Sequence, residues 1–513
     1  MSVIDSTSQA TAVGTGSKNV QLGISGENVT RKIAAIAVFD PLITTTIAEV
    51  PVQILNEADA GTRYGYGFPL HRLIKKIFEG SQGAGEVWGI PQAVTTTVSA
   101  GKVELAAGPS TEAGAIYLRI SGDLYKIDAA KAVTYENLTL AAVAQINAVA
   151  DCPVVASTSG TFELTLTAKA KGLEGDLITI TVNSGPGETT PAGLSPPVIT
   201  AMTSGAGTPD IDDALDAMGT GDEANLKNFT HIAHGYGIET TTLDKISAYN
   251  GEGNDFTGLY SKLIGRPLMA LTGDNLLGTA GYTALRVITD ARVSDKANGI
   301  LAAPDSDWNP VEMAALATGI MARISQKNPA QHFAGQILSG VGAGDTADRW
   351  TKDYSVRDSA VKGGISPTRV ISDQVVLQNI ITFYRPTTIP TASNGYKSMR
   401  SLAIIQDVLF KIRETFEAEA WQGISIVSDK SLVTDFEAKQ TARDLLDVRT
   451  QINNLADFFA SKAWFFDADF AKKNSEITIR ALSNGFDINF KWKMSGEAQI
   501  YNVQSSFDTN IAS

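Results

Sequence analysis

The chain has 513 residues, and its 42 Lys and Arg residues against 55 Asp and Glu residues give a formal net charge of −13 at pH 7. This length exceeds what one hydrophobic core usually organises, so we expect about two to four domains. So acidic a chain, without a basic stripe, is a poor candidate for direct binding of duplex nucleic acid, which needs Lys and Arg to displace phosphate counterions.

The first segment predicts a tail followed by a lone strand. Residues 1–19 are small and polar, with neither the basic start nor the apolar core of a secretory signal, so we expect none. Val20, Leu22 and Ile24 then alternate on one face, as in a short strand. No hairpin partner is nearby, so this strand either folds back on its own domain or pairs with another chain.

Residues 32–92 have the pattern of a layered α/β domain. Residues 32–39 form an apolar run that is typical of a buried strand and too short to span a membrane. A second strand is expected at residues 52–55, an amphipathic helix at 67–80 and a third strand at 86–91. This order predicts a buried sheet covered by helices.

Residues 93–207 differ in composition and predict a β-rich insertion in the order ββαββ. The expected elements are a hairpin, a short helix and two strands, at residues 115–128, 137–150, 161–168 and 176–183. Loose segments rich in Gly, Thr and Pro bound this stretch on both sides, so we expect it to leave and rejoin the main fold.

The α/β pattern resumes after the insertion. Strands are expected at residues 229–237, 268–274, 297–304 and 370–384, and helices at residues 212–224 and 310–325. Two long amphipathic helices follow, at residues 401–421 and 435–459, with apolar side chains at intervals of three and four. We expect both apolar stripes to pack against the adjacent sheet, because there are too few heptads for a coiled coil.

Three strand-like runs then follow, at residues 476–482, 486–493 and 497–507. In the last of them Tyr501, Val503 and Phe507 share one face.

The four histidines do not predict a metal site. His231 and His234 are three residues apart in a strand-like run, where their rings point to opposite faces. No third ligand is in view, and structural histidines are far more common than metal ligands in such a setting. His71 and His332 are isolated and are expected at the surface or beside a helix.

Other chemical motifs are incomplete. Asp305, Asp307 and Asn309 copy the start of a calcium-binding loop whose later positions do not match, so we expect the aspartates to cap the helix that begins near Pro310. The paired glycines complete no phosphate-binding motif and predict turns. Cys152 is the only cysteine, which excludes an intrachain disulfide and a cysteine-based zinc site. We therefore expect no catalytic residues, no metal and no cofactor, and hence no enzyme.

Several stretches, in this order along the chain, resemble the contractile tail sheath proteins of Mu-like phages. They are YGYGFPLHRLIKKIFEGSQGAGEVWGIP, the insertion that begins with AIYLRISGDLYKIDAAKA, GILAAPDSDWNPVEMAALATGIMARISQKNPAQHF, and SVRDSAVKGGISPTRVISDQVVLQNIITFYRP. None is a strict motif by itself. Their order over nearly the whole chain carries the resemblance.

The resemblance implies a structural subunit that polymerises around a tail tube and contracts to drive it through the host envelope for DNA ejection. It implies stacked hexameric rings in which terminal arm strands extend sheets of neighbouring subunits. The expected partners are other copies of the chain, the tail tube protein, and the baseplate and tail terminator proteins, without nucleic acid or membrane insertion. The expected location is the virion tail, after assembly in the host cytoplasm. The arm residues so implied are Val20, Leu22, Ile24, Tyr501, Val503 and Phe507.

The implied fold class is a multidomain α+β or α/β protein, with a layered core, an inserted ββαββ peripheral domain and extended terminal arm strands. The implied division is an N-terminal arm at 1–31, a core at 32–92 and 208–368, a peripheral domain at 93–207, a tube-facing C-terminal domain at 369–496 and a C-terminal arm at 497–513. Two alternatives stay open. One is the sheath of a headless phage-derived injection device, and the other is a soluble α/β enzyme of unknown substrate.

Overall fold

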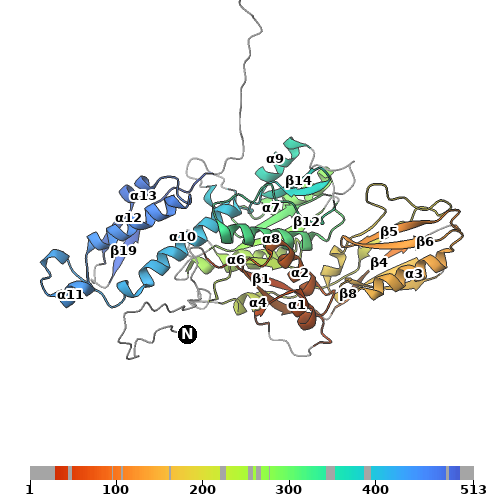
Figure 1. The fold of residues 1–513 in the computed structure, drawn as a ribbon, viewed down its shortest axis with the longest axis horizontal. Helices are drawn as coiled ribbons and strands as arrows, with labels where there is room; N and C mark the ends of the chain where they lie inside the picture. Colours follow the sequence, from red (N-terminus) through yellow and green to blue (C-terminus); the bar gives the residue numbers. More distant parts are fainter. Residues whose placement is uncertain are drawn as a thin grey trace, which may run out of the picture.

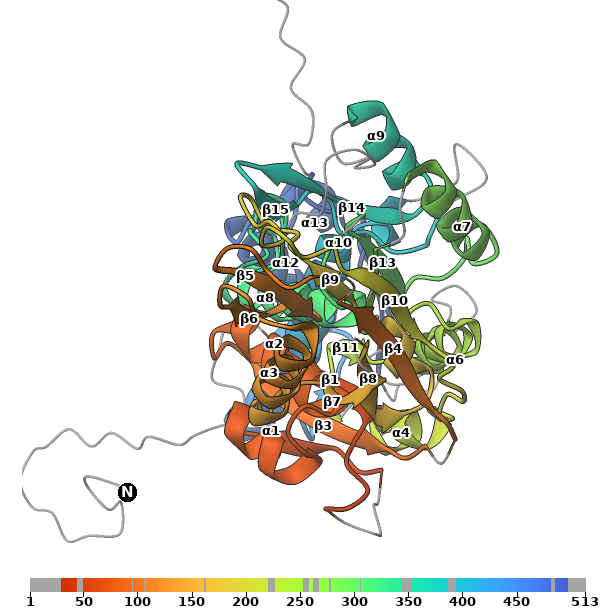
Figure 2. The ribbon, with the colours of Figure 1, turned by 90° about the vertical axis from the view of Figure 1, so that its right-hand side faces the viewer.

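The computed structural model describes residues 29–43, 49–94, 96–105, 108–160, 163–219, 227–251, 258–261, 267–275, 278–304, 306–342, 353–385, 394–480 and 485–496. These residues form a mixed α/β protein with several separate sheets. Figure 1 shows a layered α/β body in the middle, a β-rich part at one end and a mainly helical part at the other. Figure 2 views the molecule from the β-rich end, with β4, β5 and α3 in front of the central body.

The central body is built on a sheet in the order β15-β14-β13-β12-β11-β1-β3-β2. Its strands from β14 to β3 are parallel, and β2 and β15 pair antiparallel at the two edges. The strands are β1 (Lys32–Val38), β2 (Val52–Ile54), β3 (Glu86–Gln92), β11 (His231–His234), β12 (Met269–Asp274), β13 (Asn298–Ala302), β14 (Ile365–Ile371) and β15 (Gln374–Leu377).

Helices cover both faces of this sheet because its central strands are apolar on both sides. Ile33 and Ala35 of β1 pack in a cluster with α1, α2 and α8, whereas Ala34 and Ile36 pack in a cluster with α4 and α6. The helices are α1 (Glu57–Tyr64), α2 (Pro69–Ser81), α4 (Asp212–Ala217), α6 (Thr240–Asn250), α7 (Gly278–Asp290), α8 (Pro310–Lys327) and α9 (Tyr354–Lys362), with a 3-10 turn η2 (Gly258–Ser261).

The β-rich part, residues 98–203, is called the module below. It contains two sheets, in the orders β10-β4-β8-β7 and β6-β5-β9, and one helix. Its elements are β4 (Val98–Glu104), β5 (Gly114–Ile120), β6 (Asp123–Ala129), α3 (Tyr135–Ala148), β7 (Val154–Ser159), β8 (Glu163–Lys171), η1 (Leu173–Leu177), β9 (Ile180–Val182) and β10 (Val198–Thr203).

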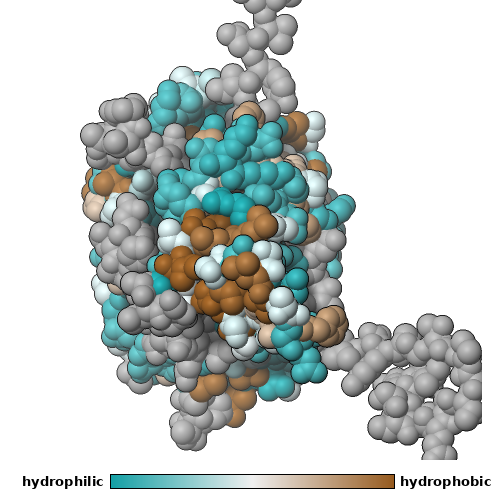
Figure 3. All heavy atoms as spheres, turned by 90° about the vertical axis from the view of Figure 1, so that its left-hand side faces the viewer, coloured by the Kyte–Doolittle hydropathy of each residue, from teal (hydrophilic) through white to brown (hydrophobic). Residues whose placement is uncertain are grey.

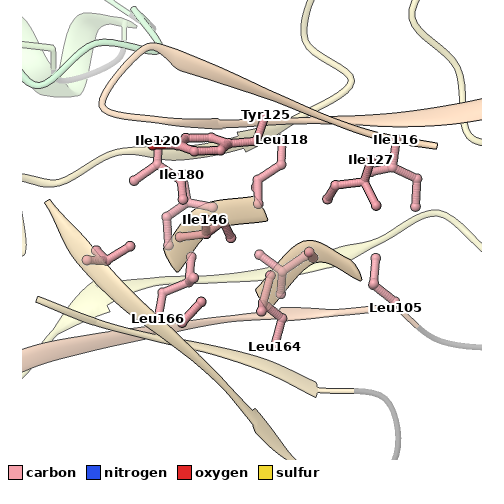
Figure 4. Close-up of a cluster of buried hydrophobic side chains, with 14 of the residues drawn as sticks. Leu105, Ile116, Leu118, Ile120, Tyr125, Ile127, Ile146, Leu164, Leu166 and Ile180 are labelled. Carbon is pink, nitrogen blue, oxygen red and sulfur yellow. The ribbon is translucent and has the colours of Figure 1, made fainter. Parts of the chain in front are cut away.

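The two sheets and the helix enclose a hydrophobic core of the module's own. Figure 4 shows the side chains that meet there from β5, β8 and α3: Ile116, Leu118, Ile120, Leu164, Leu166 and Ile146. The sequence pattern predicted the hairpin, the helix and two of the strands. Strands β4, β7 and β10 are additional to that prediction.

The helical part follows the central sheet. Its elements are η4 (Asn394–Tyr396), α10 (Met399–Glu417), η5 (Glu419–Trp421), β16 (Ser425–Ile426), η6 (Lys430–Leu432), α11 (Phe436–Thr441), β17 (Ala442–Arg443), α12 (Leu445–Ser461), α13 (Ala468–Asn474), β18 (Glu476–Ile479) and β19 (Phe486–Asn489). None of the described helices of the protein is both long enough and apolar enough to cross a lipid bilayer.

Helix α10 connects this part to the central body. Met399 and Leu402 belong to a core cluster of the central body, whereas Ile404 and Val408 pack with Val448 of α12 in a separate cluster. Apolar side chains of α10 and α12 share this second cluster with Ile477, Phe486 and Ile488 of the β18–β19 hairpin. The predicted packing of the long helices against an adjacent sheet therefore holds in part, but most of α10 packs away from the central sheet.

Residues 435–459 do not form the single helix that the sequence pattern predicted. Helix α11 ends at Thr441 and α12 begins at Leu445. The interruption has a local cause: the Asp444 side chain accepts hydrogen bonds from the backbone N–H groups of Leu446 and Asp447, while Asp447 accepts one from the Asp444 N–H. This reciprocal cap favours a new helix start.

Candidate assembly site

The predicted arm residues lie outside the described part of the chain. This applies to Val20, Leu22 and Ile24 in the N-terminal segment, and equally to Tyr501, Val503 and Phe507. Both arm strands therefore stay predictions. The structure does describe the residues from which each of these segments leaves the body.

The N-terminal segment joins the body at Val29 and Arg31, both fully buried. The backbone N–H of Val29 donates to Asp407 Oδ1 at 2.7 Å, and the Arg31 guanidinium forms an ion pair with the same carboxylate. Arg31 Nη1 also donates to Gln406 Oε1 at 2.7 Å. The N-terminal segment is thus fixed to helix α10.

The C-terminal segment leaves from the same helix. Arg400, in the first turn of α10, donates from Nη1 to the Ser495 carbonyl at 3.0 Å and from Nη2 to Ser495 Oγ at 2.8 Å. Arg400 Nε donates to the Ala330 carbonyl at 2.5 Å, which connects this site to the end of α8. Arg400 and Asp407 are about two helical turns apart. Helix α10 therefore holds the attachment points of both terminal segments.

The hairpin formed by β18 and β19 offers open backbone edges. It is a two-stranded sheet, and within the described residues no third strand pairs with either outer edge. One face, with Ile477, Phe486 and Ile488, packs against the core that contains α12. A lone hairpin is only marginally stable in water, and its free N–H and C=O groups are a template for further strands.

An apolar surface lies at the far end of the helical part. Figure 3 shows a hydrophobic patch on this face of the molecule. Leu432, Phe436 and Leu446 of this end are 73%, 75% and 71% exposed and are called the tip patch below. The N–H of Lys430 donates to Asp444 Oδ2 at 3.0 Å, which brings the turn before Leu432 beside the start of α12.

His231 and His234 lie in the buried strand β11, where the strand-like pattern predicted them. His231 Nδ1 is 2.8 Å from Thr230 Oγ1, and His234 Nδ1 accepts from the Tyr236 N–H at 3.4 Å. Burial lowers the pKa of His231 to about 3 and that of His234 to about 4, so both imidazoles are neutral at pH 7. His332 is half-buried.

The expectation of a surface position for His71 is wrong. It lies on the inner side of α2, fully buried, and its Nδ1 accepts from the Gly67 N–H at 3.2 Å. The sequence signal was ambiguous, because PLHRLIKK places His71 next to the apolar face of an amphipathic helix. Burial lowers the pKa of His71 to about 4.

His71, Glu57 and Asp151 form the cluster in the described residues that most resembles a metal site, with potential ligand atoms within 4.8 Å of one another. The Lys75 ammonium is already 2.8 Å from Glu57 and 2.7 Å from Asp151. The Gly67 hydrogen bond makes Nδ1 of His71 an acceptor, so Nε2 carries the hydrogen and has no lone pair for a metal. The cluster is better described as an ion-paired joint between the central body and the module.

The aspartates predicted to cap α8 do not do so where they are described. The cap is Asn309, whose side chain accepts from the Val311 N–H at 3.0 Å. Asp307 instead lies 3.5 Å from Arg119 Nε of the module, and Asp305 is outside the described residues. The glycine-rich segments at Gly65, Gly67 and Gly237 are turns with positive φ, as predicted.

Comparison with known proteins identifies a relative that aligns with most of the chain. No protein-family model matches it. In sequence, 451 residues are 26% identical to the Mu-like prophage FluMu tail sheath protein of Haemophilus influenzae, an alignment that covers 84% of this chain and 85% of that protein. This relative confirms the resemblance to Mu-like tail sheath proteins that the sequence predicted.

Solved structures with long alignments include two sheath proteins. The sheath tail protein of Desulfitobacterium hafniense is 12% identical and matches over 91% of this chain and 95% of its own, with a TM-score of 0.45. The contracted helical sheath of the anti-feeding prophage is 11% identical and matches over 98% and 100%, with a TM-score of 0.40.

Proposed function

We infer that this chain is a structural subunit of a contractile phage tail sheath, which polymerises around a tail tube and contracts to drive the tube through the host envelope. The observation that carries this conclusion is the alignment with the FluMu tail sheath protein over 84% of the chain. The candidate site agrees with a structural role, because its features are attachment points, open strand edges and an apolar surface.

The subunits are joined through the two terminal segments. Helix α10 binds the residue that follows the N-terminal arm, Val29, and the residue that precedes the C-terminal arm, Ser495. The free edges of the β18–β19 hairpin accept arm strands from neighbouring copies, which supply the further strands that a lone hairpin needs. Such head-to-tail exchange joins stacked hexameric rings into a helical assembly, because each copy both donates and accepts.

The core, the peripheral domain and the C-terminal domain lie at different distances from the axis of the assembly. The core, residues 32–92 and 208–368, carries the ring contacts, and the inserted peripheral domain, residues 93–207, lies outside. The C-terminal domain, residues 369–496, faces the tail tube, and the exposed tip patch supports an apolar contact there. Baseplate and tail terminator proteins close the two ends. Assembly takes place in the host cytoplasm, and the product is part of the virion tail.

Electron microscopy of the purified protein tests the assembly. The full chain is expected to form hollow striated tubes, and a variant without residues 1–28 is expected to stay as discrete particles. This deletion spares Val29 and Arg31, so a loss of tubes cannot be ascribed to the buried ion pair. A variant without residues 497–513 tests the second arm in the same way.

A point substitution provides the matched control. Leu22→Pro removes one backbone N–H from the predicted arm strand and is expected to abolish tubes. Thr7→Pro lies in the same segment but outside the predicted strand and is expected to leave tubes intact. Discrete particles from the full chain at high concentration, or tubes from the Leu22→Pro variant, would contradict the proposal.

A further inference from the structure

The central sheet has a topological switch point between β1 and β11. The chain proceeds from β1 to β3 on one side, and from β11 through β12 and β13 to β14 on the other. In open parallel sheets, the crevice at the carboxyl ends of two such neighbouring strands is where ligands bind. Here the two strands end at Val38 and His234.

In this protein the crevice is filled by the chain's own Glu174, from the η1 turn of the module. The backbone N–H of Val38 donates to Glu174 Oε1 at 3.3 Å. A Cβ at Gly235, directly after β11, would lie 2.8 Å from the same oxygen, so a larger residue there would displace the carboxyl group. Glu174 is 5% exposed. The module is thus docked by a carboxyl group placed in the crevice.

The second carboxyl oxygen has no partner. Within the described residues Glu174 Oε2 is buried and forms no hydrogen bond. A cavity of about 30 Å³ lies beside it, bounded also by Gly235, Arg72 and Glu312. A space of this size, with Arg72 and Glu312 in its wall, accommodates a water molecule, which an ionised carboxylate needs more than a neutral one does.

Among the described residues, no cation compensates a negative charge on Glu174. Arg72 of α2 is committed elsewhere, since Nε and Nη2 donate to both oxygens of Glu312 of α8 and Nη1 donates to Asp123. On the β11 side the neighbours are His234 and Tyr236. The other acidic groups nearby are Glu49, which acts on Tyr236, and Asp176 of η1, which accepts from Ser99 Oγ at 2.5 Å.

Burial raises the pKa of Glu174 to about 8. We propose that Glu174 is a protonation latch: its neutral carboxyl closes the switch-point crevice and docks the module, and loss of its proton loosens the module from the central body. The latch is a property of the single chain and does not depend on assembly.

The reactivity of the Cys152 thiol can be used to detect this opening. It is the only cysteine, it is fully buried, and its carbonyl oxygen would lie 2.3 Å from a Cβ at Gly67 of the central body. The segment with Cys152 therefore lies at the junction of the module and the body. The Cys152 side chain packs in the core of the module, so its reaction with a thiol-specific disulfide reagent measures how often the edge of the module beside this junction opens.

The experiment compares the labelling rate of the full-length protein with that of its Glu174→Gln variant between pH 6 and pH 9. Both proteins carry the same thiol, so the ratio of their rates cancels thiolate ionisation. The exposed carboxyl has an ordinary pKa near 4.5 and the buried one a pKa of about 8, so the ratio is expected to rise at least about tenfold between pH 6 and pH 8 and to level off above pH 8. Glu136→Gln, an exposed substitution on α3, is expected to match the unmodified protein at every pH.

A ratio that stays flat across this range overturns the latch. Hydrogen exchange of the unmodified protein keeps the proposal testable if the glutamine variant does not fold. Protection of the Val38 amide, corrected for the intrinsic pH dependence of exchange, is expected to fall between pH 7 and pH 9. Unchanged protection of Val38 over that interval overturns the latch as well.

Discussion

Arg31 and Asp407, 376 residues apart in the sequence, form an ion pair from which water is excluded. Asp407 also accepts from the Val29 N–H, and its neighbour Gln406 accepts from Arg31 and donates to the Thr230 and Pro267 carbonyls. The pair therefore binds the first described residues, the central sheet and helix α10 into one buried network.

The first prediction concerns this pair. Asp407→Asn leaves the Arg31 guanidinium buried without a carboxylate, and breaking a buried pair in this way costs about 3–5 kcal/mol of unfolding free energy. Urea denaturation of the full-length protein measures the loss. The double variant Arg31→Met, Asp407→Leu removes both charges and is expected to recover most of it. Equal stability of Asp407→Asn and the unmodified protein would show that the pair contributes nothing.

Local sequence patterns predicted several helices and strands. Contacts between residues far apart in the sequence could not be predicted. The apolar runs of β1, β12 and β13 and the stripe of α8 identified these elements within a few residues. The break between α11 and α12 was missed, although Asp444 followed three residues later by Asp447 is a capping signal. The apolar positions that predicted this helix, Leu445, Val448, Ile452, Leu455 and Phe459, all lie in α12.

The roles of single charged residues depend on tertiary partners. Glu174 lies between Leu173 and Gly175 in a surface-like turn, and nothing near it in the sequence indicates that it fills a crevice of the central sheet. The same applies to Arg31 and Asp407, whose contact joins distant segments of the chain. A single sequence carries no signal for such pairs.

The second prediction concerns the crossing of α2 and α8. A Cβ at Gly80 would lie 2.2 Å from the Leu316 carbonyl oxygen, and one at Gly319 would lie 2.4 Å from that of Ile77. The backbones touch at two glycines, so a methyl group must push the helices apart. Gly80→Ala is expected to cost about 1–3 kcal/mol or more of unfolding free energy in urea denaturation. Gly496→Ala, where a Cβ meets no atom within 4 Å, is the matched control and should be neutral.

The third prediction concerns acid stability. The pKa values of His231 and His234 are about 3 and about 4 in the folded chain, below the unfolded value near 6.5. Their contribution to stability is therefore complete above pH 6.5 and is lost as pH falls towards 4. The unfolding free energy is expected to drop over this interval by on the order of 3 kcal/mol for each histidine.

His231→Gln tests that linkage, because it keeps a polar side chain of similar reach and removes the titration. Its unfolding free energy is expected to fall less steeply between pH 6.5 and pH 4 than that of the unmodified protein. The comparison uses the slope with pH, so a uniform loss from imperfect packing does not affect it. Parallel slopes for the two proteins would exclude His231 as a source of acid lability.

The last prediction concerns the tip patch. Phe436 and Leu446 are 75% and 71% exposed, so Phe436→Glu and Leu446→Glu are expected to change the unfolding free energy by no more than about 0.5 kcal/mol. If the C-terminal domain faces the tail tube, two carboxylates at this surface must be desolvated on binding, which is unfavourable. Co-sedimentation with assembled tail tubes is therefore expected to be lost in the double variant. Leu140→Glu, on α3 of the module and 51% exposed, adds one such charge at the opposite end and should bind tubes normally. Equal loss in both variants would point to a general effect of charge, and normal binding of the double variant would assign the tip patch to another contact.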